Sequence, residues 1–164
     1  MRAIVVYESH WGNTAKIARA IAEGIGPDAR ALNTDEASPA VVAEADLVVA
    51  GAPIMAFGLP SDAMIANVAK DPKAPIAGDV SHPSLRHWLE ALPPSRAAAA
   101  SFETKLRWSP GGATGAIDDR FQRAGYHTIA KGQKFLVSST YGPLREGEVE
   151  RARTWGSELA ASIR

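Results

Sequence analysis

The chain begins with an apolar run and then changes to a helical pattern. Residues 2–7 show no polar alternation, which is typical of a central strand buried on both faces of a parallel sheet. From Asn13 to Ile25, isoleucines recur every four residues with charged residues between them, which predicts an amphipathic helix. Similar patterns predict further strands at residues 29–32, 46–51, 96–102 and 126–138, the last formed by two segments joined around Lys131-Gly132. They also predict a helix that opens at Ser38 and helices at residues 85–92, 114–124 and 142–163.

Strands and helices therefore alternate along the chain, except in one irregular stretch. Residues 52–83 carry five prolines and only a weak helical signal around residues 61–68, so we expect a long excursion there. Strict alternation predicts an α/β fold, in which helices cover both faces of a parallel sheet. No internal repeat or linker divides the sequence, so residues 1–164 are expected to form a single domain.

The turn between the first strand and the first helix is the strongest candidate site. The first N–H groups of a helix have no partner inside it and its dipole favours negative charge, so such a turn can hold an anion. Ser9, Asn13 and Thr14 add short polar side chains, and Gly12 lets the backbone approach a ligand without a Cβ. These features indicate a phosphate site, and a tight turn with an ordinary helix cap is the alternative.

Two further loops meet this turn if the strand order is 2-1-3-4-5, because ligands bind beyond the carboxyl ends of the strands where that order reverses. Residues 52–58 are apolar and could line a flat ring. Residues 103–112 contain Lys105, Arg107 and Trp108. Together the three loops suit a ligand that has both a phosphate and a planar ring.

Composition narrows the possible partners. The chain has 18 lysines plus arginines and 18 aspartates plus glutamates, so its formal net charge is zero. It therefore lacks the excess of positive charge that is typical of proteins that bind nucleic acid or an anionic membrane. The absence of cysteine removes disulfides, thiolate metal sites and cysteine nucleophiles, and it suits a cytoplasmic protein. No apolar run reaches the roughly 18 residues that a membrane span needs.

Several familiar sites are absent from the sequence. The first loop matches neither the G-x-x-x-x-G-K-[ST] of P-loop nucleotidases nor the G-x-G-x-x-G of dinucleotide-binding folds. The four histidines are scattered, and none has a second ligand at the spacing of a metal site, so we expect no metal.

The segment Tyr7-Glu8-Ser9-His10-Trp11-Gly12-Asn13-Thr14, followed by an Ile/Ala-rich helix, resembles the phosphate loop of flavodoxins, whose common form is T/S-x-T-G-x-T. The stretch Phe102-Glu103-Thr104-Lys105 and the closing residues 142–156 are similar to the smaller single-domain members. This resemblance spans essentially the whole chain. It implies a flavodoxin-like three-layer sandwich, with a five-stranded parallel sheet of order 2-1-3-4-5 and FMN as the cofactor.

On this resemblance, the first loop would hold the FMN phosphate and two later loops would flank the isoalloxazine ring. The implied phosphate contacts are Ser9, His10 through its N–H, Trp11, Gly12, Asn13 and Thr14, and the implied ring contacts are Pro53, Ile54, Met55, Ala56, Phe57, Glu103, Thr104 and Lys105. Trp11 departs from the family pattern, which has a small hydroxyl residue there, and the second loop lacks a stacking tryptophan. The third loop is cationic, and a cation beside the flavin would favour its reduced, anionic form and raise its potential.

The resemblance implies a redox protein that transfers electrons or hydride through non-covalently bound FMN. No catalytic side chain is expected, because the flavin supplies the chemistry. The partner would be a redox protein or a small-molecule acceptor such as a quinone, and the protein would be a monomer or homodimer. The alternative is a flavin-free flavodoxin-like module for binding or interaction, which Trp11 and the missing stacking tryptophan favour.

Overall fold

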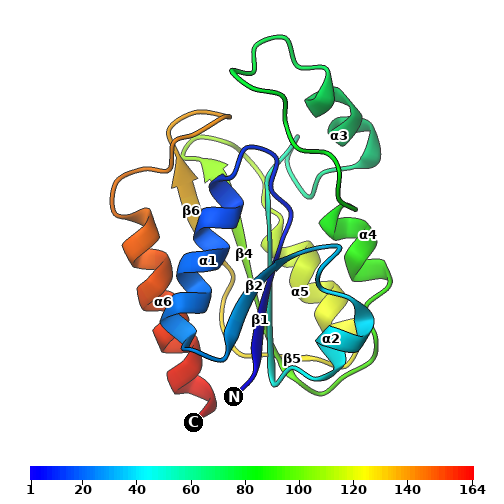
Figure 1. Cartoon of the computed structure of the whole chain (residues 1–164), viewed down its shortest axis with the longest axis vertical. Coiled ribbons are helices and arrows are strands. Elements are labelled where there is room, and N and C mark those ends of the chain that lie inside the picture. The colour runs from blue at the N-terminus through cyan, green and yellow to red at the C-terminus, as the bar shows by residue number, and fades with distance from the viewer.

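The computed structural model describes residues 1–164 and is built around a single parallel β-sheet (Figure 1). The strands lie in the order β2 (Ala29–Asn33), β1 (Ala3–Tyr7), β3 (Leu47–Pro53), β4 (Ala98–Leu106) and β5 (His127–Thr128), while β6 (Gln133–Val137) also pairs with β4. Every pair is parallel, so the predicted α/β class and the order 2-1-3-4-5 are confirmed.

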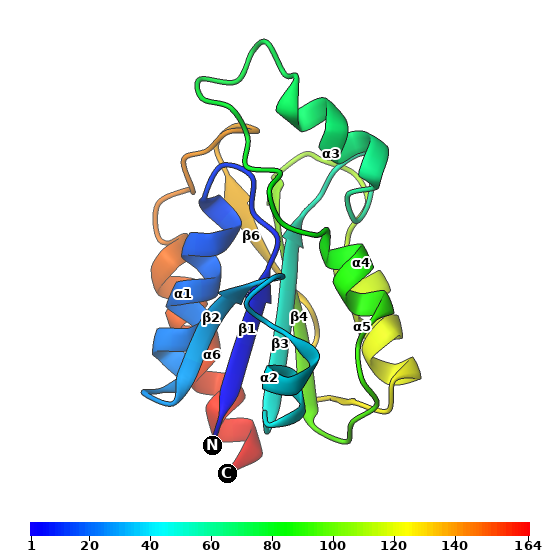
Figure 2. The same cartoon turned by 45° about the vertical axis from the view of Figure 1, so that its right-hand side comes forward.

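Helices cover both faces of the sheet, as the alternation predicts (Figures 1 and 2). One face carries α1 (Asn13–Ile25) and α6 (Glu148–Ile163), and the other carries α2 (Pro39–Ala43), α4 (Leu85–Glu90) and α5 (Thr114–Arg123). α3 (Asp62–Ala69) stands beyond the carboxyl edge of the sheet, inside the proline-rich excursion. None of these helices combines the length and the apolar character that crossing a bilayer requires.

Alternation of side chains along the strands builds two separate cores. In β1, Ile4 and Val6 pack with residues of α2, α4 and α5, whereas Ala3 and Val5 pack with residues of α1 and α6. All four side chains are buried. A strand that is covered on both faces needs apolar residues at every position, which explains the unbroken apolar run at the start of the sequence.

The predicted fifth strand is two strands in the structure, so the sheet has six strands and the expected count of five was wrong. β5 pairs with the first two residues of β4, and β6 pairs with its last five. Residues 129–132 leave the ladder between them, beside the start of α5. A Cβ added to Gly132 would lie 2.4 Å from Thr114 Cβ, so the chain needs glycine where α5 passes over the break.

The start of α6 closes the open edge of β6. This helix begins at Glu148, later than the predicted start at residue 142, after Gly147 (φ 85°). Glu148 Oε2 accepts a 2.6 Å hydrogen bond from Leu136 N, and Arg151 donates to the Lys134 carbonyl. An unpaired strand edge is a template for pairing with other chains, and these side chains occupy it.

Candidate functional site

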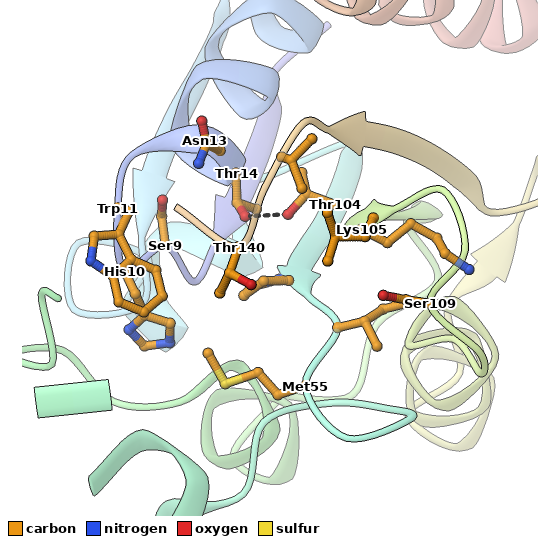
Figure 3. A pocket seen from close by; sticks show the side chains of 14 residues that line it. Ser9, His10, Trp11, Asn13, Thr14, Met55, Thr104, Lys105, Ser109 and Thr140 are labelled. Carbon is orange, nitrogen blue, oxygen red and sulfur yellow. Dashed lines mark hydrogen bonds between the residues drawn. The ribbon is translucent and has the colours of Figure 1, made fainter. Parts of the chain in front are cut away.

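The loops that follow β1, β3, β4 and β6 meet in one pocket at the carboxyl edge of the sheet (Figure 3). The pocket has a volume of about 80 Å³. Its lining consists of Ser9, His10, Trp11, Asn13, Thr14, Pro53, Ile54, Met55, Thr104, Lys105, Leu106, Ser109, Val137 and Thr140. The structure thus brings together the three loops that the sequence analysis selected, and adds a fourth.

The first loop presents free backbone donors at the N-terminus of α1. Gly12 has φ 91°, a left-handed conformation that L side chains rarely adopt, and it turns the chain into the helix. Ser9 Oγ accepts from the N–H groups of Gly12 (3.2 Å) and Ala15 (3.3 Å). The N–H groups of Asn13 and Thr14 have no partner within the chain. The helix dipole adds a positive potential at the same point, so this end of the pocket favours an anion.

The side chains around these donors are polar but carry no negative charge. Five hydroxyl groups line the pocket, and two of them, on Thr14 and Thr104, are hydrogen-bonded at 2.7 Å. That bond ties the start of α1 to β4, as the dashed line in Figure 3 shows. None of the fourteen lining residues is acidic, and Lys105 brings a positive charge. The charge of the lining therefore suits a phosphate.

The apolar residues of the pocket lining come from the other loops. Ile54 and Met55 come from the loop after β3, Leu106 from the end of β4, and Val137 from the end of β6. In Figure 3 the Met55 side chain lies across the pocket from Ser9 and Thr14. A molecule with an anionic end and a flat apolar end would match this division.

Trp11 lines the pocket but directs its indole N–H elsewhere. Its Nε1 donates a 3.1 Å hydrogen bond to the carbonyl of Ile76 in the excursion. Its ring meets the Tyr141 ring edge-on, with centroids 4.9 Å apart. The side chain that departs from the family pattern is therefore held by contacts with two distant loops.

Four of the predicted site residues lie outside this pocket lining: Gly12, Ala56, Phe57 and Glu103. Ala56 and Phe57 form the tip of a tight turn, closed by two backbone hydrogen bonds between Met55 and Gly58 of 2.9 and 3.1 Å. Both tip residues have positive φ, 41° and 78°, which costs about 1–3 kcal/mol for each non-glycine residue. The Phe57 side chain is 68% exposed, so this turn holds an aromatic ring out into solvent.

Glu103 is fully buried and serves the fold instead. β4 continues to Leu106, past the predicted end at residue 102, so Glu103 lies within a strand. Its Oε1 accepts hydrogen bonds from the N–H groups of Ala113 (2.9 Å) and Thr114 (3.2 Å). The side chain thereby caps the N-terminus of α5 from the neighbouring strand β4. Its Oε2 has no hydrogen-bond partner.

His10 takes part in a buried ion pair beside the first loop. Its Nε2 lies 2.7 Å from Glu8 Oε2, and both side chains are 4% exposed. Its Nδ1 lies 2.6 Å from the carbonyl of Asp79, which can only accept, so Nδ1 carries a hydrogen. Burial alone would lower the pKa of His10, but the hydrogen bonds with Glu8 and Asp79 outweigh it and raise that pKa. Glu8 Oε1 also accepts from Leu85 N at 2.7 Å, so the pair links the first loop to α4.

Sequence reasoning missed the fourth loop of the pocket. Val137 ends β6 and Thr140 follows it, while Leu106 ends β4 and Ser109 follows it. A signal for the fourth loop was present, because the carboxyl ends of all strands in a parallel sheet lie at the same edge. The helix predicted to start at residue 142 concealed the loop, because it begins only at Glu148.

No protein-family model matches the chain, and no curated protein matches it in sequence. Among solved structures, a flavodoxin from the domain Archaea superposes with a TM-score of 0.70 at 20% identity, covering 99% of both chains. Oxidised flavodoxin 1 from Bacillus cereus gives 0.66 at 17% identity, covering 98% of each chain. The rubredoxin oxygen:oxidoreductase of Desulfovibrio gigas gives 0.65 at 15% identity, with 99% of this chain and 36% of that chain covered.

These superpositions cover nearly the whole of this chain. The chain has the flavodoxin-like fold. The fold that the first loop and the alternating pattern predicted is therefore confirmed.

Proposed function

We propose that the pocket binds FMN non-covalently and that the protein transfers electrons or hydride through it. One observation carries the proposal: the free N–H groups at the start of α1 open into a pocket whose lining has hydroxyls and a cation but no acid. The fold supports it as well, because the superposed structures include flavodoxins.

The residues present fit the two ends of FMN. The N–H groups of Asn13 and Thr14 and the hydroxyls of Thr14 and Thr140 would hold the phosphate, and Met55 and Leu106 would contact the ring. The volume of about 80 Å³ is below the ~300–1,000 Å³ of sites that enclose a drug-sized ligand. The pocket would therefore enclose part of the flavin and leave the rest at its open rim.

The flavin, when bound, supplies the redox chemistry, and the chain positions it and sets its electrostatic surroundings. The dipole of α1 and its free N–H groups bind the phosphate, which fixes the orientation of the ligand. Lys105 lines the pocket, is half-buried and forms no ion pair. Its positive charge would favour the reduced, anionic form of the ring and so raise the potential.

Titration of the purified apoprotein with FMN, followed by quenching of flavin fluorescence, tests the proposal. We expect saturable binding, and riboflavin, which lacks the phosphate, should bind about 100-fold more weakly if the phosphate end supplies ~3 kcal/mol. Ser9→Asp, which puts a carboxylate at the phosphate end, should weaken FMN binding and leave riboflavin binding nearly unchanged. A chain that takes up no added FMN would contradict the proposal.

A second candidate function is a flavin-free binding module that keeps the fold. The small pocket volume favours it, as does the lack of an aromatic residue among the apolar lining residues opposite the first loop. In this case the same titration gives no saturation, and the protein purifies without a yellow chromophore.

Within the redox proposal, the electron acceptor is either a partner protein or a small molecule such as a quinone. Consumption of NAD(P)H by the FMN-loaded protein with a quinone present would support small-molecule reduction. A loaded protein that accepts electrons from a chemical reductant such as dithionite, but does not oxidise NAD(P)H with a quinone present, would support a carrier that serves another protein.

A further inference from the structure

Residues 61–78, which contain α3, are fixed to the rest of the chain at both of their ends. We call this segment the lid, and Figure 2 shows it projecting beyond the carboxyl edge of the sheet. Just before the lid, Arg86 donates a 2.8 Å hydrogen bond to the carbonyl of Leu59. Just after it, the Asp79 N–H donates to the His10 carbonyl at 2.8 Å, and the Asp79 carbonyl accepts from His10 Nδ1 at 2.6 Å.

Between these ends the lid adds almost nothing to the packed interior. None of its residues belongs to either of the two cores. Only Val68 and Gly78 are buried, and a Cβ added to Gly78 would be 2.4 Å from Val68 Cγ1 and 3.2 Å from Trp11 Cζ2. Segments with so little buried apolar surface open at a small fraction of the free energy of global unfolding.

Two hydrogen bonds hold the lid against the loops of the pocket. Trp11 Nε1 donates to the Ile76 carbonyl at 3.1 Å. Tyr141 donates from its hydroxyl to Asp71 Oδ2 at 2.6 Å, and its ring meets the Trp11 ring edge-on. No other hydrogen bond joins residues 61–78 to the rest of the chain. Trp11 and Tyr141 therefore keep the lid closed.

The same contacts reach the end of the pocket that favours an anion. Trp11 lines the pocket and lies just before Asn13 and Thr14, whose N–H groups are free. A hollow of about 200 Å³, lined in part by His10 and Gly12, remains beside the first loop, so this end of the pocket is not sealed. An anion bound to the free N–H groups would fix the loop that carries Trp11, and would thereby favour the closed lid.

From these contacts we infer that the lid opens as one unit while the rest of the chain stays folded, and that an anion at the N-terminus of α1 favours its closed position. Because such coupling is reciprocal, opening the lid weakens anion binding by the same factor by which the anion stabilises the closed lid. The coupling rests on the proposed function, whereas the opening of the lid does not.

The chain has no cysteine, so a single thiol label can report the position of the lid. Ala77→Cys places a bimane dye between Ile76 and Gly78, the two lid residues that contact Trp11. A nearby indole quenches bimane, so the label is dim when the lid is closed and bright when it is open. In urea, we expect its fluorescence to rise before the loss of far-UV circular dichroism that reports global unfolding. The same label in Trp11→Phe gives the unquenched level.

Tyr141→Phe tests how the lid is held, because it removes the hydroxyl that binds Asp71 and keeps the ring. It should raise the ratio of open to closed lid by about 5- to 10-fold, which corresponds to the loss of one hydrogen bond. Tyr126→Phe is the matched control, because it removes the same atom from a tyrosine that packs against Phe121 in α5, away from the lid. It should leave the ratio unchanged.

Inorganic phosphate is the probe for the coupling, at a urea concentration where the lid is half open and the rest of the chain is folded. Saturating phosphate should lower the ratio of open to closed lid by about 5-fold or more. Ser9→Asp, which puts a carboxylate at the same end of the pocket, should abolish this effect.

The outcomes separate the lid from the proposed function. Fluorescence and circular dichroism that change together, or a Tyr141→Phe variant that opens no more easily than the labelled parent, would overturn the lid. If phosphate leaves the ratio unchanged although FMN binds, the coupling is wrong and the proposed function stands. If the lid opens separately but the chain binds neither FMN nor phosphate, the coupling and the proposed function are overturned and the lid stands.

Discussion

Two helices begin at the same edge of the sheet, each directly after a strand, yet their N-termini are used in opposite ways. α1 follows β1, and its N–H groups at Asn13 and Thr14 have no partner within the chain. α5 follows β4, and its N–H groups at Ala113 and Thr114 bind the carboxylate of Glu103. The strand–helix geometry is similar, but one terminus is open to an external anion and the other is filled by an internal one.

The difference indicates which terminus is able to accept an external anion: the start of α1, to which the chain supplies no acidic side chain of its own. Ser9 partly caps α1 with a neutral oxygen, which leaves the positive potential of the helix uncompensated. Glu103 supplies a carboxyl oxygen to the first N–H groups of α5 inside the core, where no cation pairs with it. The predictions that follow test this contrast, beginning with the largest expected effect.

Glu103→Ala should produce the largest loss of stability. It removes the acceptor of two buried N–H groups and leaves a cavity, so the free energy of unfolding should fall by about 2–4 kcal/mol. Glu103→Gln keeps the Oε1 acceptor and should cost about half as much or less. Urea unfolding at neutral pH measures both, with Ser9→Ala as the counterpart at α1.

Ser9→Ala should cost only about 0.5–1 kcal/mol, which is the usual loss when a neutral hydroxyl cap is removed from a helix. If it destabilises the protein as much as Glu103→Ala, the two helix termini contribute equally to stability and the contrast between them disappears.

Ser9→Asp should convert the open terminus into a filled one. A carboxylate within about 5 Å of a bound phosphate repels it by ~2–4 kcal/mol at an effective dielectric constant near 20, which corresponds to roughly 100-fold weaker FMN binding. The same charge favours the N-terminus of α1, so stability should stay level or rise by up to ~1 kcal/mol. Ser9→Asn, neutral and of equal size, is the control. Unchanged FMN affinity in Ser9→Asp would show that the phosphate is bound elsewhere.

The Glu8–His10 pair should make the stability of the protein depend on pH through the first loop. No histidine lies at the α5 terminus, so that end of the contrast should show no such dependence. The folded chain raises the pKa of His10 above its ordinary 6.5, so it holds this proton more tightly than the unfolded chain does. The resulting stabilisation is complete below about pH 6.5 and is lost as the pH rises through the folded pKa. After deprotonation, the Nε2 lone pair faces the Glu8 carboxylate, and the bond between them weakens.

Thermal unfolding from pH 6 to 9 checks this dependence. The natural chain should lose stability across that range, and His10→Gln should abolish most of the slope. His82→Gln removes an exposed histidine, which is paired with Asp35, and should leave the slope in place. A slope that survives in His10→Gln belongs to another group.

Inorganic phosphate should stabilise the protein only where the N-terminus of α1 is open. Ligand binding to the folded state alone adds RT ln(1 + [L]/Kd), or about 1.4 kcal/mol at ten times the Kd. We expect the melting temperature to rise with phosphate for the natural chain and for Glu103→Gln, but not for Ser9→Asp. Stabilisation that persists in Ser9→Asp would place the anion at another part of the surface.

The sequence predicted the open terminus well and the filled one poorly. The first loop lies between an unbroken apolar run and a clear helical stripe, so local patterns define its place and its donors. Glu103 was assigned to a loop because the alanine-rich stretch before it gave β4 no distinct end. Within the longer strand, successive side chains point to opposite faces of the sheet, so Glu103 faces α5 and Thr104 faces α1. No local sequence pattern shows that α5 begins next to Glu103.

The contacts between residues 71–80 and the first loop could not be predicted from any local sequence pattern. Prolines indicated that residues 52–83 leave the regular alternation, but they carry no information about where that stretch returns. Trp11 meets Ile76 across 65 positions of sequence, and Tyr141 meets Asp71 across 70. Such contacts depend on how three loops are arranged in the folded chain. The sequence therefore shows that Trp11 departs from the family pattern, and only the structure shows which residues it contacts.

The two ends of the chain lie together at the opposite edge of the sheet from the pocket (Figure 1). An affinity tag, a fused protein or a linker to an electrode attached at either end would therefore project away from the bound ligand. Immobilised molecules would all present the pocket outward, in one orientation. Voltammetry of such a layer could measure the potential of the loaded protein directly, without a diffusing mediator.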